Sequence, residues 1–472
     1  MISMKHIIQQ IAQELVEKII KKAYSGKISD IDALTEDILA DCKASAARVV
    51  EEILAEMNRQ IREDKQARKE QGLVMKQKDR PRSLLTKLGM LHIARDYYYD
   101  KVNGSHVCIL DKVAGIPAYE RITGGVSARL VSLATEVSYA KSAQFGAAGA
   151  ISRQSVRNKI LKLGALEKRP EPKEEKRAVK ELHVFADEDH VHLQKPNKRK
   201  GKKSRSVPLV TVTEGVTSRC GRRETIRPMH FVDEDFDTKR LWKSVEGYIG
   251  AAYDLEALEA VYLHADGGQW IKGGLENFAQ RKMVMDGYHF EKELKELGRQ
   301  FPRKNVQQRL RKALKDDDRK KADEILQSLC IRSDKEEMKR VSRFGVYLMG
   351  HWDAIRRRVS EGLPGSCTEG QVSHILSERF SRDPLGWSEE GLGKLSKQRV
   401  YLKNKGKIEA SDFKKTKESD TYSQYAQRII DKTCEKELDW SIFEKQEPNF
   451  DGASGTQILL HKTAQLRDLR LN

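Results

Sequence analysis

The sequence predicts a mixed α/β protein, in which a mostly helical N-terminal region precedes a sheet flanked by helices. Over the first 70 residues, apolar positions recur at spacings of three or four with charged residues between them. From residue 182 onward, β-branched and alternating segments replace that pattern. Successive strands followed by a strand–helix alternation are typical of a mixed sheet covered by helices.

The composition points to a polyanionic partner. The 472 residues carry a formal net charge of +18, with 33% charged and 38% hydrophobic residues. Nucleic acid is the usual partner of such a chain, and an anionic membrane surface is the alternative. The six cysteines include no CxxC pair, which excludes a zinc ribbon and favours reduced thiols in the cytoplasm. We expect neither a signal peptide nor a membrane span, because no apolar run reaches the required length of about 18 residues.

The first element is a helical region over residues 1–75. Its apolar stripe comprises Ile31, Leu34, Ile38, Val49, Ile53, Met57 and Ile61. Such a stripe packs against its own domain or against a partner helix in an oligomer, and both alternatives stay open.

A DNA-binding region is predicted over residues 80–165. A small β element at 83–111 is expected to turn at Asn103-Gly104, because Asn-Gly between two alternating runs is typical of a hairpin. A helix-turn-helix follows over about 138–163, in which one helix ends near Phe145-Gly146 and Ser152 begins the next.

The second helix of this pair is polar and basic, as a helix that enters the major groove should be. Arg153, Gln154 and Arg157 on it are candidate DNA contacts. An ordinary helical hairpin is the alternative interpretation.

The second half of the chain is expected to form one large domain over 182–400, after a charged linker at 166–181. The predicted elements are strands at 182–194, 207–216 and 227–235, a helix near 238–252, a strand at 260–266, a charged helical stretch at 290–360 and a polar tail over 401–472.

Two of these strands carry carboxylates. Asp266 ends the apolar run AVYLHAD and precedes two glycines, so it lies where a buried strand gives way to a turn. Open sheets commonly hold ligands and metal ions at such strand ends. Asp187 and Asp189 share one face of an earlier strand, because side chains alternate with period two. A turn aspartate and an exposed edge strand are the alternatives without a catalytic role.

Further candidates follow in the chain. Glu369 is expected in the first turn of a helix that Thr368 caps, and Glu378 competes with it. Asp286 and His289 are spaced i, i+3, which places them on one face if both lie in a helix. They could orient each other or a phosphate, or simply support the structure.

Two or three carboxylates that converge on one site are enough for metal-dependent phosphodiester chemistry. Two hard cations, Mg²⁺ or Mn²⁺, can activate the attacking oxygen and stabilise the leaving oxygen, and both ions prefer oxygen ligands. The basic run 195–205 joins the first two strands beside the proposed site and would meet the DNA backbone. Its candidate contacts are Lys198, Arg199, Lys200, Lys202 and Lys203. A solvated hairpin tip is the alternative.

Four motifs in order carry a resemblance. They are ADEDHVHLQ, YLHADGGQWIK, MDGYHFEK and VSHILSERFSRDPLGWSEEG. Together they resemble the Lre-type insertion-sequence transposases, a group that has also been described as an uncharacterised protein family and is distantly similar to Mutator-like transposases. The similarity extends over about residues 80–400.

The resemblance implies a ribonuclease-H-like catalytic core with a DDE triad and a helical insertion between the second Asp and the Glu. The triad falls on Asp187, Asp266 and Glu369, and the Asp-x-x-His element of Mutator-like enzymes falls on Asp286 and His289. Where the family usually has Asp-Gly, Asp187 is followed by Glu188, so Asp189 stays an alternative first metal ligand.

The resulting hypothesis is a bacterial, nucleoid-associated DDE transposase. It would cleave and join DNA at terminal inverted repeats and target sites with two metal ions, as a homo-oligomer on double-stranded DNA. The alternative is a catalytically silent, transposase-derived DNA-binding protein, which predicts intact basic segments and a dispensable triad. A structural or RNA-associated protein would use the basic surface alone, and a membrane-surface role has least support.

Overall fold

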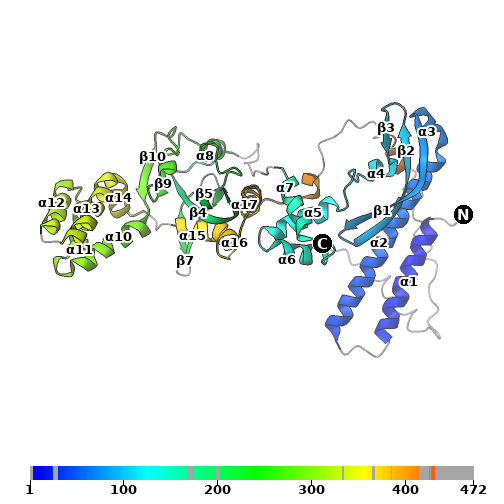
Figure 1. Cartoon of the computed structure of the whole chain (residues 1–472), viewed down its shortest axis with the longest axis horizontal. Helices are drawn as coiled ribbons and strands as arrows, with labels where there is room; N and C mark the ends of the chain where they lie inside the picture. The colour runs from blue at the N-terminus through cyan, green and yellow to red at the C-terminus, as the bar shows by residue number, and fades with distance from the viewer. Residues whose placement is uncertain are drawn as a thin grey trace. The chain divides into compact units, whose positions relative to one another are not determined.

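The computed structural model describes residues 4–24, 30–164, 166, 175–197, 202–219, 222–331, 334–363, 367–383, 385–413, 425 and 427–430. The chain forms two compact units, one comprising Met1–Ala128 with Glu409–Asn472 and the other comprising Arg129–Ile408. Both contain helices, and the described residues form three sheets, so the mixed α/β class is confirmed (Figure 1). Across these described ranges, no helix combines the length and apolar character that a membrane crossing requires.

The first unit opens with helices, as predicted for residues 1–75. These are α1 (Met4–Tyr24), α2 (Ile31–Glu63) and α3 (Lys65–Glu70). The Asp30 carboxylate caps α2 by accepting backbone N–H groups of its first turn. Helices α1 and α2 lie antiparallel (Figure 1), held by ion pairs of 2.6 Å between Lys22 and Asp41 and between Arg48 and Glu14.

An antiparallel sheet packs against α2. Its strands are β1 (Leu73–Thr86), β2 (Gly89–Asp100) and β3 (Ser105–Val107), in that order across the sheet. The hairpin predicted at Asn103-Gly104 is confirmed, since Asp100 pairs with Ser105 across it. The expectation that β structure begins at residue 83 was wrong. Strand β1 begins at residue 73, and its outer residues are polar because one face of this sheet is not buried in the core.

The core of the first unit lies between α2 and this sheet. Met57 and Ile61 of α2 are buried with Ile93 and Tyr98 of β2, beside α4 (Ile109–Val113). Tyr425 and Ile429, from the C-terminal part of the chain, complete this core. The second half of the apolar stripe on α2 is therefore used within its own unit.

The predicted helix-turn-helix is present as a pair of helices. They are α6 (Tyr139–Ala147) and α7 (Arg153–Lys162), preceded by α5 (Gly124–Ala134). Ala148 ends α6 in the left-handed conformation at φ 48°, and the hydroxyl of Ser152 caps α7 by accepting the Ser155 N–H. The boundary between the units falls within α5, so the predicted region 80–165 is divided between them.

The second unit is built on a five-stranded mixed sheet. Its strands are β4 (Glu181–Asn197), β5 (Lys202–Thr213), β8 (Met229–Phe231), β9 (Ala260–Ala265) and β10 (Arg281–Met285). The order across the sheet is β10-β9-β4-β5-β8. Strands β4, β5 and β8 are antiparallel neighbours, whereas β9 and β10 run parallel to β4. Strand β10 was not predicted, because its five residues include two cations and lack alternation.

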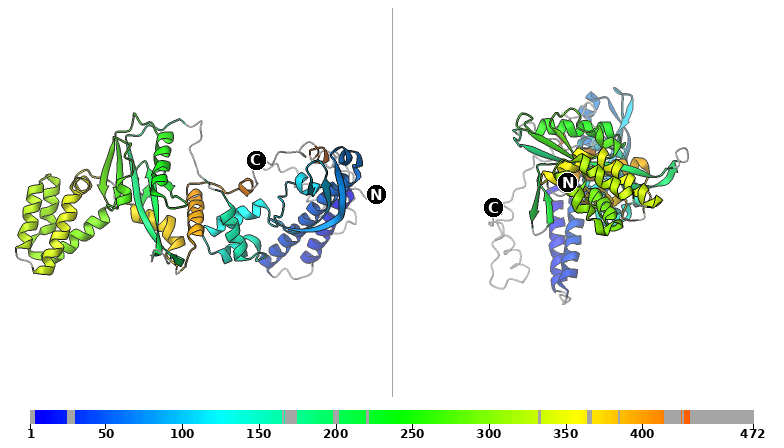
Figure 2. Two further views of the ribbon diagram at one scale, coloured as in Figure 1. Left: turned by 45° about the horizontal axis from the view of Figure 1, so that its top comes forward. Right: turned by 90° about the vertical axis from the view of Figure 1, so that its left-hand side faces the viewer.

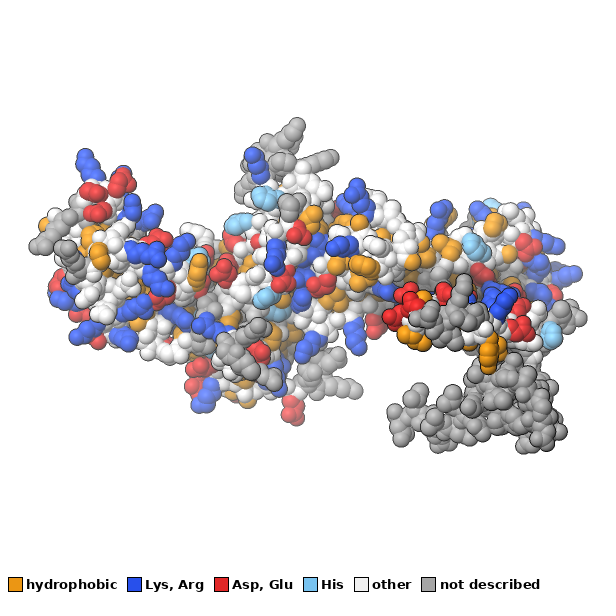
Figure 3. All heavy atoms as spheres, turned by 90° about the horizontal axis from the view of Figure 1, so that it is seen from below, with side chains coloured by type: hydrophobic (Ala, Val, Ile, Leu, Met, Phe, Trp, Pro, Cys, Tyr) orange, Lys and Arg blue, Asp and Glu red, His pale blue; other side chains and the backbone are white. Residues whose placement is uncertain are grey.

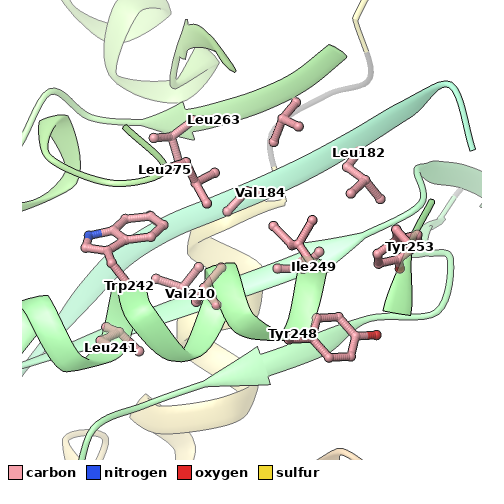
Figure 4. Packing of buried hydrophobic residues seen from close by; sticks show 14 of the residues in the cluster. Leu182, Val184, Val210, Leu241, Trp242, Tyr248, Ile249, Tyr253, Leu263 and Leu275 are labelled. Atoms are coloured by element: carbon pink, nitrogen blue, oxygen red, sulfur yellow. The ribbon is translucent and has the colours of Figure 1, made fainter. Parts of the chain in front are cut away.

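One face of this sheet is covered by α8 (Thr238–Ala252), which has the predicted bounds. Val184 of β4, Val210 of β5 and Leu263 of β9 pack under Trp242 and Ile249 of α8 (Figure 4). Even-numbered residues of β4 face this core, so odd-numbered residues face the other side. This arrangement decides which carboxylates of β4 can reach the opposite face.

The opposite face carries a series of short helices that follows the insertion (Figure 2). They are α15 (Thr368–Val372), one turn of π-helix η2 (Ser373–Ser377) and α16 (Glu378–Phe380), followed by the longer α17 (Glu389–Lys403). Helix α15 packs against β4, and α17 packs against α7 and η2. A π-helical turn is rare and is often found at functional sites.

The predicted helical insertion is confirmed. It comprises α10 (Gly287–Gln300), η1 (Pro302–Lys304), α11 (Val306–Lys315), α12 (Arg319–Cys330), α13 (Lys335–Gly350) and α14 (Trp352–Ser360). These helices have their own core, which includes Leu310, Leu329, Phe344 and Trp352. In Figure 1 they lie beyond the β10 edge of the sheet.

The remaining segments differ in part from expectation. A second hairpin, β6 (Val216–Arg219) and β7 (Arg222–Thr225), was not predicted, and the short α9 (Gln269–Lys272) and η3 (Ala410–Phe413) complete the elements. Residues 167–174 of the predicted linker lie outside the described residues. Its end does not behave as a linker, because Arg177 lies 4.5 Å from the Tyr253 ring and 3.0 Å from Glu214.

Candidate active site

Three aspartates lie at one level across three neighbouring strands. Strand β9 pairs with β4 so that His264 lies beside Phe185, and β10 pairs with β9 so that Met285 lies beside Ala265. Two residues further along β4 and β9, Asp187 lies beside Asp266. One residue further along β9 and β10, Asp266 lies beside Asp286, so the three aspartates form one row. We call this set the carboxylate row. It lies where β9 and β10 end, which is where the sequence predicted a site.

Asp187 is half-buried, and its environment holds further charged groups. Burial raises the pKa of its carboxyl from 3.8 to about 6, although the Glu188 N–H donates to it at 2.8 Å. The carboxylates of Asp266 and Glu188 raise the pKa further, and His289 opposes them. The structure therefore brings Asp187, Asp266 and His289 within electrostatic reach of one another.

Asp266 begins a tight turn. Its Oδ1 accepts the Gly268 N–H at 2.8 Å, and Gly267 has φ 100°. A Cβ on Gly267 would lie 3.3 Å from Cε1 of His351, so the insertion approaches this turn closely. The Asp266 side chain itself is exposed, which leaves its other oxygen accessible to a ligand.

Asp286 differs from the prediction in its setting. It does not lie within a helix, because it follows β10 and caps α10, where its carboxylate accepts the Tyr288 N–H at 3.3 Å. The i, i+3 contact still forms, since Nε2 of His289 lies 3.9 Å from Oδ2 of Asp286. Asp286 is buried and the His289 side chain is half-exposed. His289 is therefore the member of the pair that can reach a ligand.

The structure separates Asp187 from Asp189. Asp189 is 8% exposed, and its Oδ1 accepts the Ser381 hydroxyl at 2.9 Å. Burial also raises the pKa of this carboxyl, but no carboxylate of the row contributes to its shift. Asp187, and not Asp189, therefore lies in the carboxylate row.

Glu188 faces the other side of the sheet, as the period of two predicts. The indole Nε1 of Trp270 donates a hydrogen bond to its Oε2. Glu188 is thus held on the α8 side and is not positioned with the odd-numbered carboxylates of β4.

Glu369 and Glu378, which the sequence could not separate, have different environments. Glu369 lies in the first turn of α15, as predicted, and is exposed. The predicted cap was wrong, because Cys367 precedes α15 and Thr368 is its first residue. Glu378 accepts from His374 at 2.8 Å and lies 3.7 Å from Arg399. The Glu378 carboxylate is therefore held by His374 and Arg399, whereas the exposed Glu369 carboxylate can accept a ligand.

A basic cleft of about 1170 Å³ contains two of the predicted site residues. Asp286 and Glu369 both line it, although no hydrogen bond or ion pair joins Glu369 to the row among the described residues. Its lining combines five cations, Arg223, Arg311, Lys312, Lys315 and Arg358, with four carboxylates, Asp286, Glu291, Asp316 and Glu369. Figure 3 shows Lys and Arg side chains over the helical insertion as well as over the sheet. A cleft with this lining suits a phosphate backbone.

Tyr347 and His351 of the insertion were missed by sequence reasoning. Burial raises the pKa of the Tyr347 hydroxyl, and the carboxylates of Glu293, Asp286 and Asp266 add to the rise. Its oxygen has no hydrogen-bond partner among the described residues, and its ring lies 5.6 Å from that of His351. The charged periodicity of the insertion predicted only helices, and nothing in it pointed to these two residues.

The polar face of α7 is only partly engaged. Arg153 and Gln154 are exposed, and the Gln154 amide donates to Asn158 at 3.0 Å. Arg157 lies 3.9 Å from Glu390 of α17. These positions are compatible with the predicted DNA contacts, which stay a prediction.

Helix α7 is fixed to the segment that carries Glu369. The Gln398 amide of α17 donates to the Ile160 carbonyl at 2.9 Å. Arg399, 1% exposed, donates to the carbonyls of Thr135, His374 and Ile375. Removal of such a buried cation would leave several carbonyls without partners.

The basic run at 195–205 is described only in part. Lys198, Arg199 and Lys200 lie outside the described residues, Lys202 begins β5, and Lys203 is exposed.

Ten residues of β4 separate Asp187 from Asn197, which corresponds to roughly 33 Å at the rise of a strand. The loop itself, residues 198–201, lies outside the described residues, so its place beside the site stays a prediction. The strands β4 and β5 continue as a long hairpin beyond the level of the row.

The donors of the row suit a hard divalent cation. Carboxylate oxygens are the ligands that Mg²⁺ and Mn²⁺ prefer, and Asp187 is crowded by carboxylates in a way that a cation would relieve. Across the described ranges, no group of three or more His, Cys, Asp and Glu side chains converges tightly enough to hold a metal by itself. Asp187 and Asp266 are therefore the pair on which a metal site would be built.

Comparison with known proteins places the chain in a family. A model described as "Uncharacterised protein family (UPF0236)" matches residues 27–417. A UPF0236 protein of Caldanaerobacter subterraneus subsp. tengcongensis, whose name joins eleven locus designations, is 33% identical over 372 residues, which cover 78% of this chain and 77% of the relative. Another from that organism, whose name joins four designations, is 32% identical over 372 residues with the same coverage. The chain belongs to the uncharacterised protein family UPF0236.

Proposed function

We propose that this protein is a DDE-type DNA transposase with a ribonuclease-H-like core, as its resemblance to the Lre-type and Mutator-like enzymes implies. The observation that carries the proposal is the carboxylate row, in which Asp187 and Asp266 lie side by side on the neighbouring parallel strands β4 and β9. A mixed sheet in the expected part of the chain supports it. The helical insertion between Asp266 and Glu369 supports it as well.

Asp187 and Asp266 would hold the divalent cations, with Glu369 as the third carboxylate. When bound, such ions make an oxygen nucleophilic and stabilise the oxygen that leaves phosphorus. The cations of the basic cleft would bind the phosphates on either side of the scissile bond. His289, oriented by Asp286, could donate a hydrogen bond to a phosphate oxygen.

The remaining parts have roles that follow from the same proposal. Helix α7 would read the terminal repeats, and its connection through α17 would keep it in register with the segment that carries Glu369. DNA joining requires more than one active site, which favours a homo-oligomer on DNA. The DNA in these roles is double-stranded, both at the ends of the element and at the target site.

The names of the relatives lend independent support. Names that join eleven and four locus designations in one organism describe proteins encoded repeatedly in one genome. Repeated insertion of a mobile element would produce this pattern. Ordinary housekeeping proteins have no comparable reason to recur.

The test is cleavage of end-labelled duplex DNA that spans both flanks of the gene, with Mg²⁺, Mn²⁺ or EDTA. The proteins to compare are the wild type, Asp266→Asn and the control Asp323→Asn, which removes an exposed carboxylate of α12. We expect metal-dependent nicking by the wild type and the control. We expect Asp266→Asn to lose about 10³-fold or more of the rate while it retains DNA binding.

Two results would count against the proposal. Binding without cleavage by the wild type under either metal would leave the silent DNA-binding descendant. Absence of specific DNA binding would remove both functions.

A further inference from the structure

The sheet of the first unit presents a row of aromatic rings on the face opposite α2. Tyr97 and Tyr99 alternate along β2, and His106 of β3 pairs directly with Tyr99. The rings of Tyr97 and His106 lie 5.2 Å apart with an angle of 9° between their planes. The ring of Tyr99 lies 5.1 Å from that of His106 at 59°. We call these three residues the aromatic face.

Two cations lie over these rings. The guanidinium of Arg80 is 4.8 Å from the centre of Tyr97, and Nζ of Lys76 is 5.6 Å from the centre of Tyr99. Both cations lie on β1, where two register shifts interrupt the pairing with β2. Lys76 and Arg80 are exposed, so neither charge is buried against the rings. The face thus combines π surfaces with cations that can move.

The aromatic face is distinct from the core of its own unit. Tyr98, between the partly exposed Tyr97 and Tyr99, is 0% exposed and points to α2 with Asp96. Because strand side chains alternate, Tyr97 and Tyr99 cannot join that core. Their rings therefore do not contribute to the packing that holds the sheet on α2.

We propose that the aromatic face binds single-stranded DNA by stacking unpaired bases on Tyr97, Tyr99 and His106. Bases stack on exposed aromatic rings whatever their sequence, and nearby cations follow the phosphate backbone. Lys76 and Arg80 would exchange their ring contacts for phosphates or would cover the outer side of a bound base. Paired bases in a duplex offer no free π surface to a sheet, which excludes intact duplex as the ligand.

The choice of DNA rests on the proposed function, because strand cleavage at element ends exposes unpaired DNA. The stacking chemistry does not depend on it. The aromatic face belongs to the first unit, whereas the carboxylate row belongs to the second. Binding can therefore be measured in EDTA, where cleavage plays no part.

The test uses the full-length protein and fluorescence anisotropy with labelled dT20, an abasic strand of equal length, rU20 and a 20-base-pair duplex. The double variant Tyr97→Leu with Tyr99→Leu keeps apolar side chains but removes the rings. Tyr119→Leu is the matched control, since Tyr119 is a fully exposed tyrosine of the same unit without a ring contact among the described residues.

We expect the double variant to bind dT20 at least about tenfold more weakly, because loss of one stacked base costs roughly 5- to 150-fold in affinity. The control should bind as the wild type does. The wild type should bind the abasic strand about as weakly as the double variant binds dT20.

Equal affinity of the wild type for dT20 and the abasic strand would overturn the proposal, since phosphate contacts alone would then explain binding. This comparison needs no variant, so it holds even if the double variant fails to fold. Tighter binding of rU20 than of dT20 would overturn the assignment to DNA. A protein that binds dT20 as expected but never cleaves DNA would contradict only the proposed function.

Discussion

The two larger sheets of this protein differ in how much of their surface is buried, and the difference determines where each can carry function. The five-stranded sheet has α8 on one face and α15–α17 on the other, so ligands can approach only where its strands end. The carboxylate row lies where β9 and β10 end, although β4 continues beyond it. The three-stranded sheet is buried on one face, which includes Tyr98, whereas Tyr97, Tyr99 and His106 lie on the other face.

When both faces of a sheet are buried, ligands can bind only where strands end, and burial shifts the pKa of the carboxyls near those ends. A carboxylate on β4 is half-buried by its neighbours, which raises the pKa of Asp187 to about 6. Side chains on the open sheet are solvated and hold ordinary cation–π contacts. Substitutions in the carboxylate row of the five-stranded sheet should therefore have large effects on activity. Substitutions on the open face of the three-stranded sheet should have small effects on stability.

The largest expected effect concerns Glu369 and its competitor Glu378. We expect Glu369→Gln to slow DNA cleavage by at least about a hundredfold, because it removes a proposed metal ligand. Glu378→Gln should change the rate by less than about threefold, since Glu378 lies outside the carboxylate row and its partner His374 is largely exposed to solvent. Single-turnover cleavage rates measure both. If Glu378→Gln slowed cleavage more than Glu369→Gln did, the third carboxylate of the site would be Glu378 and not Glu369.

A smaller effect is expected on stability when Asp187 is replaced by Asn. A carboxyl whose pKa rises from 3.8 to about 6 on folding loses stability as pH rises through that window, because the unfolded chain ionises first. In EDTA at pH 7.5, Asp187→Asn should raise the free energy of unfolding by about 1–3 kcal/mol. The gain should vanish below about pH 4.

Urea unfolding at the two pH values measures this difference. The matched control is Asp323→Asn, which should show no such dependence. A destabilised Asp187→Asn protein at pH 7.5 would show that the carboxylate is needed for folding and not held at a cost for function.

The smallest expected effect is on the open sheet. Arg80→Ala removes one cation–π contact with Tyr97 and should lower the free energy of unfolding by less than about 1 kcal/mol. Urea unfolding followed by tyrosine fluorescence measures it. A loss of several kcal/mol would mean that this face stabilises the unit, and it would weaken the contrast between the two sheets.

Much of the fold was predictable where the residue pattern had one clear period. Helix α8 has the predicted bounds, and Ser152 begins α7 as its capping side chain indicated. Strand β9, apolar on both faces, was equally clear. Strands β1, β6, β7 and β10 were missed or shortened, because polar outer faces and short lengths remove the period on which the prediction depends.

The candidate site was predictable in its residues but not in its geometry. Asp266 was named from a strand end and Asp187 from one face of a strand, yet only the pairing of β4 with β9 shows that they are neighbours. The choice between Asp187 and Asp189 required the Ser381 contact. The electrostatic influence of Asp286 and Asp266 on Tyr347 depends on how α13 packs, which no local pattern encodes.

The most direct test of the central claim is a double-mutant cycle on Asp187 and Asp266 in single-turnover cleavage of labelled DNA. If the two carboxylates act as one unit, Asp187→Asn and Asp266→Asn should each reduce the rate by about 10³-fold or more. The double variant should then be no slower than either single variant, with DNA binding retained in all three. Cleavage by either single variant at the wild-type rate would contradict the assignment of the carboxylate row as the active site.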